Sequence, residues 1–171
     1  MTQPVQEPIQ ATDLNANLMS SKNKQGSKVV NPKTNQLSFG RIPSNNNGIP
    51  TGEIYLKLGF IGSGKMRTGA YGARHIWEKH KKDLNIESPE ETPEVIANIL
   101  KEGVDVLVNF EANHDPHRPV VLNTELGRVA LSLYVEHGIN AYSIVSAYGN
   151  KNAVGTVIGQ LESPIINTPE N

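Results

Sequence analysis

The feature that most constrains the fold is the second half of the sequence, where short apolar segments follow one another with only tight turns between them. Segments of strand-like composition lie at 104–110, 119–125, 128–136 and 141–149, and 153–161 is either a further strand or a short helix. Strands joined by such short connections pair with their neighbours in an antiparallel sheet. We therefore expect a curved antiparallel sheet built mostly from this half of the chain.

The preceding segment supplies one more strand and two helices. Residues 53–60 alternate apolar and polar side chains, the period of a half-buried strand. Apolar residues recur every three or four positions over 73–84, which predicts a helix. A second helix, 92–103, begins with Thr-Pro-Glu and stops at a glycine. Helices that precede a run of strands indicate an α+β fold, with two N-terminal helices packed on one face of the sheet.

The first 50 residues differ in composition from the rest. They are rich in Gln, Asn, Ser, Lys and Pro, and Phe39 is their one aromatic residue. Such a segment buries too little apolar surface to offset the entropy lost on ordering it. We interpret residues 1–50 as a flexible polar linker or arm, in which a short helix near residue 12 is an alternative. Residues 51–171 are expected to form one folded domain.

The sequence also lacks features that define other classes of protein. It contains no cysteine, which excludes a disulfide scaffold and a thiolate metal site. No apolar run reaches the roughly 18–20 residues that span a bilayer. The first residues do not show the basic and apolar regions of a secretory signal. We expect neither a membrane span nor a cofactor.

The net charge of −1 conceals a marked asymmetry. Residues 57–82 carry seven basic side chains against one acidic side chain, a balance of +6, whereas 83–171 carry four against thirteen, a balance of −9. An anionic ligand should therefore meet the first block. The alternative is a lysine-rich helix that is merely exposed to solvent. The basic residues expected to bind substrate are Lys57, Lys65, Arg67, Arg74 and Lys79.

A glycine-rich loop lies within this basic block. Gly59, Gly64 and Lys65 fit the spacing of a nucleotide phosphate loop, but residue 66 is Met where that motif needs a hydroxyl for magnesium. A mostly antiparallel sheet is also a poor host for such a motif. We therefore favour a loop that contacts a phosphate through Lys65 and Arg67 without being a nucleotide motif.

A second cluster resembles part of a metal site. His114, Asp115 and His117 lie close together in an expected surface loop, with no evident third or fourth ligand from a rigid element. We interpret them as solvated turn residues, and we expect no metal.

The strongest candidates for chemistry are two of the five histidines, His75 and His80, on one expected helix in the basic block. His80 lies in line with the apolar stripe, where a histidine is more often a packed core residue than a functional one. The two rings lie about 140° apart around the helix, so a joint site requires His75 to reach across the helix rim. The basic surroundings and the neighbouring glycine loop favour a functional role.

A late strand contributes hydroxyl groups. Tyr142, Ile144, Ser146 and Tyr148 alternate along 141–149 and should share one face. Hydroxyls so placed are suitable donors to a phosphate oxygen, so we add Tyr142 and Tyr148 to the expected substrate-binding residues. Simple β-packing is the alternative.

Histidines, cations and hydroxyls together suit the cleavage of RNA without a metal ion. RNA carries its own nucleophile, the 2′-hydroxyl. The protein then needs a group to remove that proton, a group to protonate the leaving 5′-oxygen, and donors that stabilise charge on the phosphorus. Histidine titrates in the range that both proton transfers need, and Lys, Arg, Ser and Tyr stabilise the transition state. The product is a 2′,3′-cyclic phosphate.

The motifs GEIYLKLG and GARHIWEKH, followed by a helix, RPVVLN, a hairpin and YSIVSAYG, resemble the phage and polymorphic-toxin members of the Barnase–EndoU–Colicin–RelE (BECR) group of ribonucleases. The resemblance covers residues 52–150. It implies a histidine-bearing helix before a curved antiparallel sheet, and a catalytic set of His75, His80 and Ser146. Tyr148 corresponds to the aromatic residue that follows the hydroxyl residue in this group. The tail after residue 149 is longer than this group leads us to expect.

The resemblance also implies a biological context. It suggests a metal-independent endoribonuclease toxin domain that cleaves RNA, with transfer RNA as the substrate and a cognate immunity protein as the partner. Such a domain is secreted, or delivered as part of a larger toxin or phage particle, and acts in the bacterial cytoplasm.

Two other functions remain as alternatives. One is a non-catalytic anion- or RNA-binding accessory module of a phage or toxin, which would use the basic helix only to hold an anion. The other is a nucleotide-processing or ADP-ribosyl enzyme, which is weaker because no acidic catalytic pair is apparent.

Overall fold

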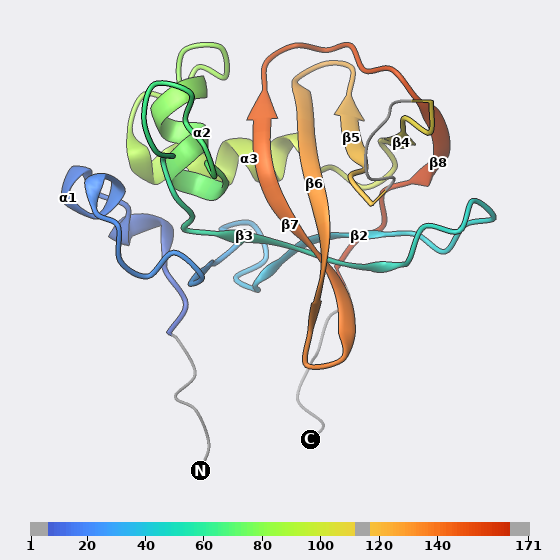
Figure 1. The fold of residues 1–171 in the computed structure, drawn as a ribbon, viewed down its shortest axis with the longest axis horizontal. Coiled ribbons are helices and arrows are strands. Elements are labelled where there is room, and N and C mark those ends of the chain that lie inside the picture. The colour runs from blue at the N-terminus through green and yellow to red at the C-terminus, as the bar shows by residue number, and fades with distance from the viewer. Residues whose placement is uncertain (1–6, 112–116, 165–171) are drawn as a thin grey trace.

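The protein has an α+β fold in which a mostly antiparallel sheet is accompanied by a few short helices (Figure 1). The structure is a computed structural model that describes residues 7–111 and 117–164. The strands are β1 (Lys28–Val29), β2 (Ser38–Ile42), β3 (Gly52–Lys57), β4 (Asp105–Val108), β5 (Val120–Asn123), β6 (Gly127–Glu136), β7 (Ile139–Tyr148) and β8 (Thr156–Gln160). The helices are α1 (Ala16–Ser20), α2 (Gly72–His80) and α3 (Thr92–Ile99), with 3₁₀ turns at Ala11–Asp13 and Pro89–Glu91.

The predicted strands of the second half are confirmed, including the uncertain last one, which forms β8. The strand order is β1-β3-β7-β6-β5-β4-β8, and β2 pairs with β3 beside β1. One pair, β3 with β7, is parallel and all the others are antiparallel.

The sheet curls until its two outer parts meet. Arg41 in β2 and Glu162, just after β8, exchange two backbone hydrogen bonds of 2.9 and 3.0 Å. Because β2 is attached to β3, this contact nearly closes the sheet into a barrel around the core. Figure 1 shows the result, with β2 and β3 running across the lower part of β6 and β7.

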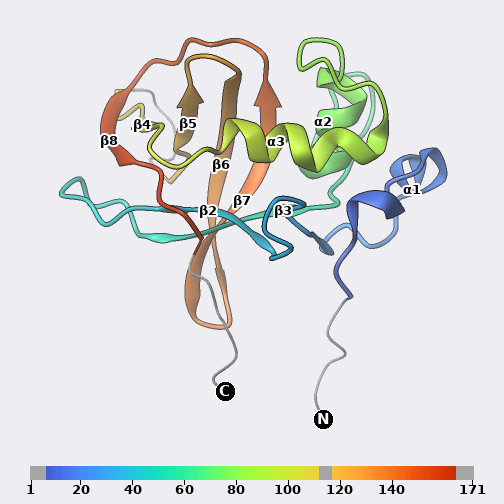
Figure 2. The ribbon, with the colours of Figure 1, turned by 180° about the vertical axis from the view of Figure 1, so that it is seen from behind.

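The two main helices are present but do not come first in the chain. Three strands and α1 precede α2, so the predicted arrangement of two N-terminal helices is not confirmed. Helix α2 packs against β7 and β3, whereas α3 packs against β5 and β6 on the side that faces the viewer in Figure 2. Helical turns continue beyond α2 to Leu84, and Asn85, with φ +58°, ends them in the left-handed conformation.

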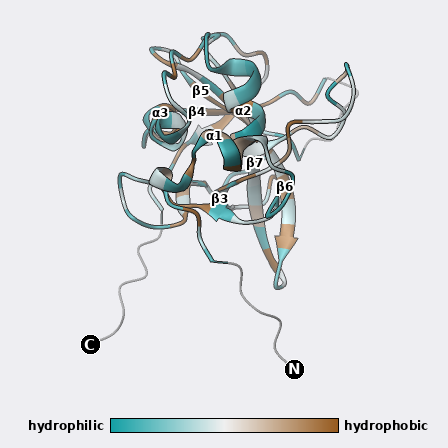
Figure 3. Ribbon diagram, turned by 90° about the vertical axis from the view of Figure 1, so that its left-hand side faces the viewer, coloured by the Kyte–Doolittle hydropathy of each residue, from teal (hydrophilic) through white to brown (hydrophobic). Residues whose placement is uncertain are grey.

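Helix α2 is unusually polar for a helix that packs on a sheet. Its ribbon is mostly hydrophilic in Figure 3, yet its first five residues are all buried. Two of these buried residues are Arg74 and His75. Buried polar groups require partners, so the neighbours of these two side chains decide whether they are structural or functional.

The prediction that the first 50 residues form a flexible arm is wrong for the part that the structure describes. Residues from this segment enter the same core as the C-terminal strands, and β1 and β2 extend the sheet. The buried apolar residues are Ile9, Leu14, Met19, Val29, Val30, Phe39, Ile42 and Ile49. They are scattered among polar residues without the spacing of a helix or a strand, so they give no periodic signal.

We expect Phe39→Ala to destabilise the protein by about 3–5 kcal/mol, because Phe39 is 1 % exposed and its loss leaves a cavity in the core. Urea unfolding followed by circular dichroism measures the change. Lys33→Ala, at an exposed position of the same segment, should stay within about 0.5 kcal/mol of the parent. Equal stability of the two variants would show that this segment is indeed a detached arm.

Candidate active site

Helix α2 begins where the chain turns sharply beyond the end of β3. Gly72 has φ +79°, and a Cβ at this position would lie 2.6 Å from the carbonyl oxygen of Lys57. Only glycine suits both the backbone angle and the close approach. The turn therefore brings the first residues of α2 directly against the sheet.

His75 and Ser146 meet between α2 and β7. The Nε2 atom of His75 lies 3.1 Å from the Oγ atom of Ser146, although the two residues are 71 positions apart in the chain. Both side chains are buried, with exposed fractions of 9 % for His75 and 1 % for Ser146. The juxtaposition that the sequence predicts is therefore present, but it lies beneath the surface.

An irregularity in β7 directs Ser146 toward the helix. Along the β6–β7 ladder, Ala130 pairs with Ser146 and the next residue, Leu131, pairs with Ile144, so Val145 is left over as a bulge. Paired residues project from the same face of a sheet and successive residues from opposite faces. Ser146 therefore projects from the face opposite to Ile144. The prediction that Tyr142, Ile144, Ser146 and Tyr148 share one face is wrong.

His80 completes the cluster from the end of α2. Its ring centroid lies 5.5 Å from that of His75 and 4.6 Å from that of Tyr148, with both pairs edge to face. Its Nδ1 atom lies 3.2 Å from Oδ1 of Asp83, and the other oxygen of Asp83 accepts a 2.7 Å hydrogen bond from the backbone N–H of Gly149. With Nδ1 engaged, the Nε2 atom of His80 is the nitrogen left for a substrate.

Two arginines supply positive charge around this cluster. The guanidinium of Arg128, from β6, lies 4.8 Å from the ring centroid of Tyr148, and it also donates to the carbonyl of Asn152. Arg67, from the glycine-rich loop, donates a 3.0 Å hydrogen bond to Glu78 on the outer side of α2. Arg128 is therefore placed to attract an anion to the rings of Tyr148 and His80, whereas the charge of Arg67 is partly offset by Glu78.

The pKa of His75 is lowered from 6.5 to about 4, chiefly because burial disfavours the charged imidazolium. The positive charges of His80, Lys79 and Arg67 lower it further. His75 is therefore neutral at pH 7, so it acts there as a hydrogen-bonding group rather than as an acid.

The hydrogen bonding of His75 indicates its tautomer. Its Nδ1 atom is buried and has no hydrogen-bond partner among the described residues. An unpaired N–H is rarer in protein interiors than an unpaired acceptor, so we assign the proton to Nε2. Nε2–H then donates to Ser146, so the Ser146 hydroxyl hydrogen does not point to His75.

Two of the expected substrate-binding residues are structural. Arg74 is 1 % exposed, and its guanidinium donates to the carbonyls of Leu18 and Gly59 at 3.0 and 3.1 Å. Tyr142 is fully buried and donates a 2.6 Å hydrogen bond to the carbonyl of Pro50. Both residues satisfy main-chain groups of the N-terminal half, so neither is available to a phosphate.

The other expected contacts are distributed over the surface. Lys65 and Lys79 are exposed, and Arg67 is half-buried near the histidines. The ammonium of Lys57 lies 3.9 Å from the ring centroid of Tyr134, away from His75 and His80. Lys57 therefore belongs to a different part of the sheet from the histidine cluster.

Sequence reasoning missed two residues of the cluster, Asp83 and Arg128. Asp83 lies three positions after His80, on the same side of the helical turn, and this spacing was a usable signal. Arg128 lies opposite Tyr148 in the ladder, which becomes apparent only when the register is known.

The described residues contain no group of three or more His, Asp or Glu side chains that could hold a metal ion. His114 and Asp115 lie outside the described residues, so this finding does not bear on them. Within the described ranges, no helix is long and apolar enough to cross a membrane.

Compared with known proteins, the chain matches no protein-family model, no curated protein and no solved structure. A functional interpretation therefore depends on the geometry of the cluster and on the chemistry of its side chains.

We expect the stability of the protein to fall as the pH is lowered from 6.5 to about 4. In this range the unfolded chain protonates His75 and the folded protein does not, so the difference reaches about 3 kcal/mol near pH 4 and stays constant below it. Urea unfolding at a series of pH values measures the slope.

His75→Gln removes the titrating ring and should flatten this part of the pH profile, whereas His117→Gln, at an exposed position, should not. Parallel profiles for the parent and His75→Gln would show that His75 is not held neutral by the fold.

Proposed function

We propose that the cluster of His80, Tyr148, Arg128, Ser146 and His75 is the active site of a metal-independent endoribonuclease. The observation that carries this proposal is the convergence of a histidine, a phenol, a hydroxyl and a guanidinium from α2, β6 and β7. Proton carriers beside anion-stabilising donors are the groups that cleavage by the RNA 2′-hydroxyl requires.

In this proposal His80 takes the proton from the 2′-hydroxyl through Nε2. The 2′-oxygen bonds to phosphorus, and the bond from phosphorus to the 5′-oxygen breaks. Tyr148, whose ring touches that of His80, gives its hydroxyl proton to the leaving oxygen and later regains one from His80. Arg128 is close enough to offset the negative charge that Tyr148 develops. The product is a 2′,3′-cyclic phosphate.

The remaining residues position these groups or stabilise charge. The carboxylate of Asp83 accepts a hydrogen bond from Nδ1–H of His80 and thereby fixes the orientation of the ring. His75 donates to the buried Ser146, and this pair supports the ring of His80 from beneath. This gives His75 a positioning role instead of the proton-transfer role first expected, because a buried neutral ring exchanges protons poorly at pH 7.

A non-catalytic anion-binding module is the second candidate. The observation that favours it is that His75 and Ser146 are buried and satisfy one another, as a structural pair does. In that case RNA would bind with an affinity that weakens with salt, and no cleavage would follow.

The resemblance to BECR ribonucleases adds a substrate and a partner to this proposal. It suggests transfer RNA as the molecule that is cut and an immunity protein that covers the site. The substrate is tested directly, since incubation with total cellular RNA reveals the RNA species that is fragmented.

We expect the purified protein to cleave RNA in buffer that contains EDTA, and His80→Gln or Tyr148→Phe to lower the rate by about 100-fold or more. His117→Gln provides a matched control, because it removes an exposed histidine outside the cluster. Gel electrophoresis of labelled RNA, with mapping of cyclic phosphate ends, measures the result. Cleavage that needs an added divalent ion, or that survives in both variants, would refute the proposed mechanism.

Asp83→Ala should lower kcat by about tenfold and leave KM nearly unchanged. The reason is that the carboxylate orients His80 and does not itself contact RNA. The loss is smaller than the loss of His80 itself, because the imidazole remains and only its orientation is less well fixed. Asp83→Glu should recover part of the loss. A rise in KM with constant kcat would instead show that Asp83 affects binding.

A further inference from the structure

The open face of the sheet continues away from the proposed active site. Pairing along the ladders places Ser132 and Tyr134 of β6 on the same face as Ser146. Tyr55 of β3 lies beside Ser143 of β7 on this face, and Lys57 follows two residues later. Unlike the buried Ser146, the other five polar side chains on this face are partly exposed: Tyr55, Lys57, Ser132, Tyr134 and Ser143. We call these residues, together with Lys28 and Glu136, the tyrosine face.

The tyrosine face combines two aromatic rings with two ammonium groups. The Nζ atom of Lys28 lies 4.1 Å from the ring centroid of Tyr55, and that of Lys57 lies 3.9 Å from the ring centroid of Tyr134. Glu136 accepts hydrogen bonds from Lys28 at 2.6 Å and from Tyr134 at 3.0 Å. Burial raises the pKa values of both phenols, so the rings stay neutral beside a phosphate.

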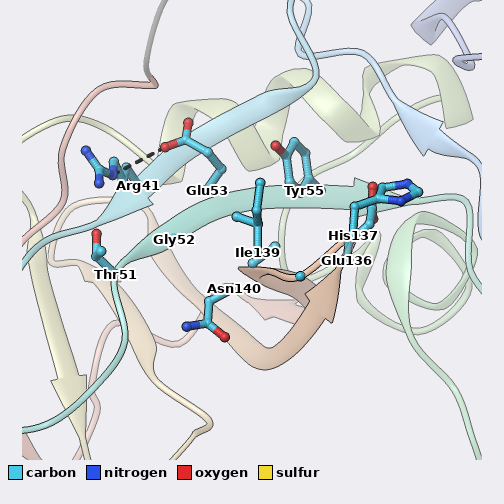
Figure 4. Close-up of a pocket in the computed structure, with 11 residues that line it drawn as sticks. Arg41, Thr51, Gly52, Glu53, Tyr55, Glu136, His137, Ile139 and Asn140 are labelled. Carbon is cyan, nitrogen blue, oxygen red and sulfur yellow. Dashed lines mark ion pairs between the residues drawn. The ribbon is translucent and has the colours of Figure 1, made fainter.

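A hollow of about 520 Å³ adjoins the far end of this face, between β3 and the β6–β7 hairpin (Figure 4). Figure 4 shows Glu53, Ile139 and Tyr55 projecting to the same side of β3. The carboxylate of Glu53 is paired with Arg41 at 3.4 Å, and Glu136 is paired with Lys28. Because these charges are paired internally, the hollow suits a neutral planar group better than an ion.

The hollow also offers contacts that a nucleobase uses. Its lining includes the ring of Tyr55, the apolar side chain of Ile139, which is 69 % exposed, and the hydroxyl of Thr51, which donates to the carbonyl of Ile42 and can still accept a hydrogen bond. Aromatic rings stack on bases, and a hydroxyl oxygen accepts from the amino groups at their edges.

The tyrosine face connects the hollow with the proposed active site. Ala130 pairs with Ser146 and Glu136 pairs with Ile139, so the two ends are six residues apart along β6. At about 3.3 Å per residue the separation is about 20 Å. With a rise of about 3.4 Å per stacked nucleotide, a dinucleotide at the active site does not reach the hollow, whereas a longer strand does.

We propose that the tyrosine face is a binding track for single-stranded RNA, which rests on the proposed function of the neighbouring site. Lys57 contacts a phosphate, Tyr134 and Tyr55 stack on bases, and the hollow receives a base several nucleotides from the scissile bond. Single-stranded RNA is favoured over duplex RNA because rings on a sheet face contact bases only when these are unpaired.

The test compares a dinucleotide with a long single-stranded oligonucleotide that contains the same cleavable step. Lys57→Ala and Tyr134→Leu should each lower kcat/KM for the long substrate by about tenfold, through KM, and leave dinucleotide cleavage within about twofold. Unchanged dinucleotide cleavage also shows that the variants are folded. Lys101→Ala, which removes an exposed lysine near the C-terminal end of α3, should affect neither substrate.

Binding is measured separately with an oligonucleotide that carries a 2′-O-methyl group at the cleavable step and is therefore not cut. Lys57→Ala should reduce the salt dependence of its binding by about 0.7 in log–log slope, the effect of one lost phosphate contact on a single strand. Equal losses on both substrates, or no loss on either, would overturn the track while leaving the proposed enzyme intact.

If the parent protein cleaves nothing, the proposed function fails and the uncleavable oligonucleotide still decides the track. Weaker binding by Lys57→Ala and Tyr134→Leu supports the track in that case. Unchanged binding by both variants overturns it, and would be the result if this face served a protein partner instead of RNA.

Discussion

The arrangement of the whole site depends on how little of β7 is paired with β3. The parallel ladder joins the two strands only over residues 141–143 of β7, and β3 ends two residues beyond it, at Lys57. The chain turns at Gly72 and returns as α2, which packs against the part of β7 that has no neighbour on that side. The bulge at Val145 directs Ser146 toward this helix. A short ladder, a glycine turn and one extra residue together bring His75 to Ser146.

The same region shows that two buried polar side chains can differ in how fully their hydrogen-bonding groups are satisfied. Arg74 and His75 are neighbours on α2 and both are buried. The guanidinium of Arg74 donates to two main-chain carbonyls and thereby ties the N-terminal segment to α2. The Nε2 atom of His75 is hydrogen-bonded to Ser146, whereas its Nδ1 atom has no hydrogen-bond partner among the described residues. A fully satisfied group stabilises the fold, whereas a group with unused capacity is available for chemistry.

Much of the fold was predictable because the relevant signals are local. Periodicity and turn residues located α3 and the strands from β3 to β8. The packing of residues 7–50 was not predictable, because single apolar residues such as Phe39 gain their meaning from partners far along the chain. The convergence of His75, His80 and Ser146 was predicted, although the bulge that permits it leaves no mark in the pattern of residues 142–148. The position of Arg128 beside Tyr148 follows from the strand register, and the structural roles of Arg74 and Tyr142 follow from their burial. A single sequence specifies neither.

The backbone contact between Arg41 and Glu162 joins segments that are about 120 positions apart and brings the two outer parts of the sheet together. The two segments can pair only after both have been synthesised, whereas hairpins such as β6–β7 involve neighbouring residues and form locally. Contacts so distant in sequence also slow folding. We therefore expect the formation of this contact to follow that of the local hairpins and to limit the folding rate of the protein.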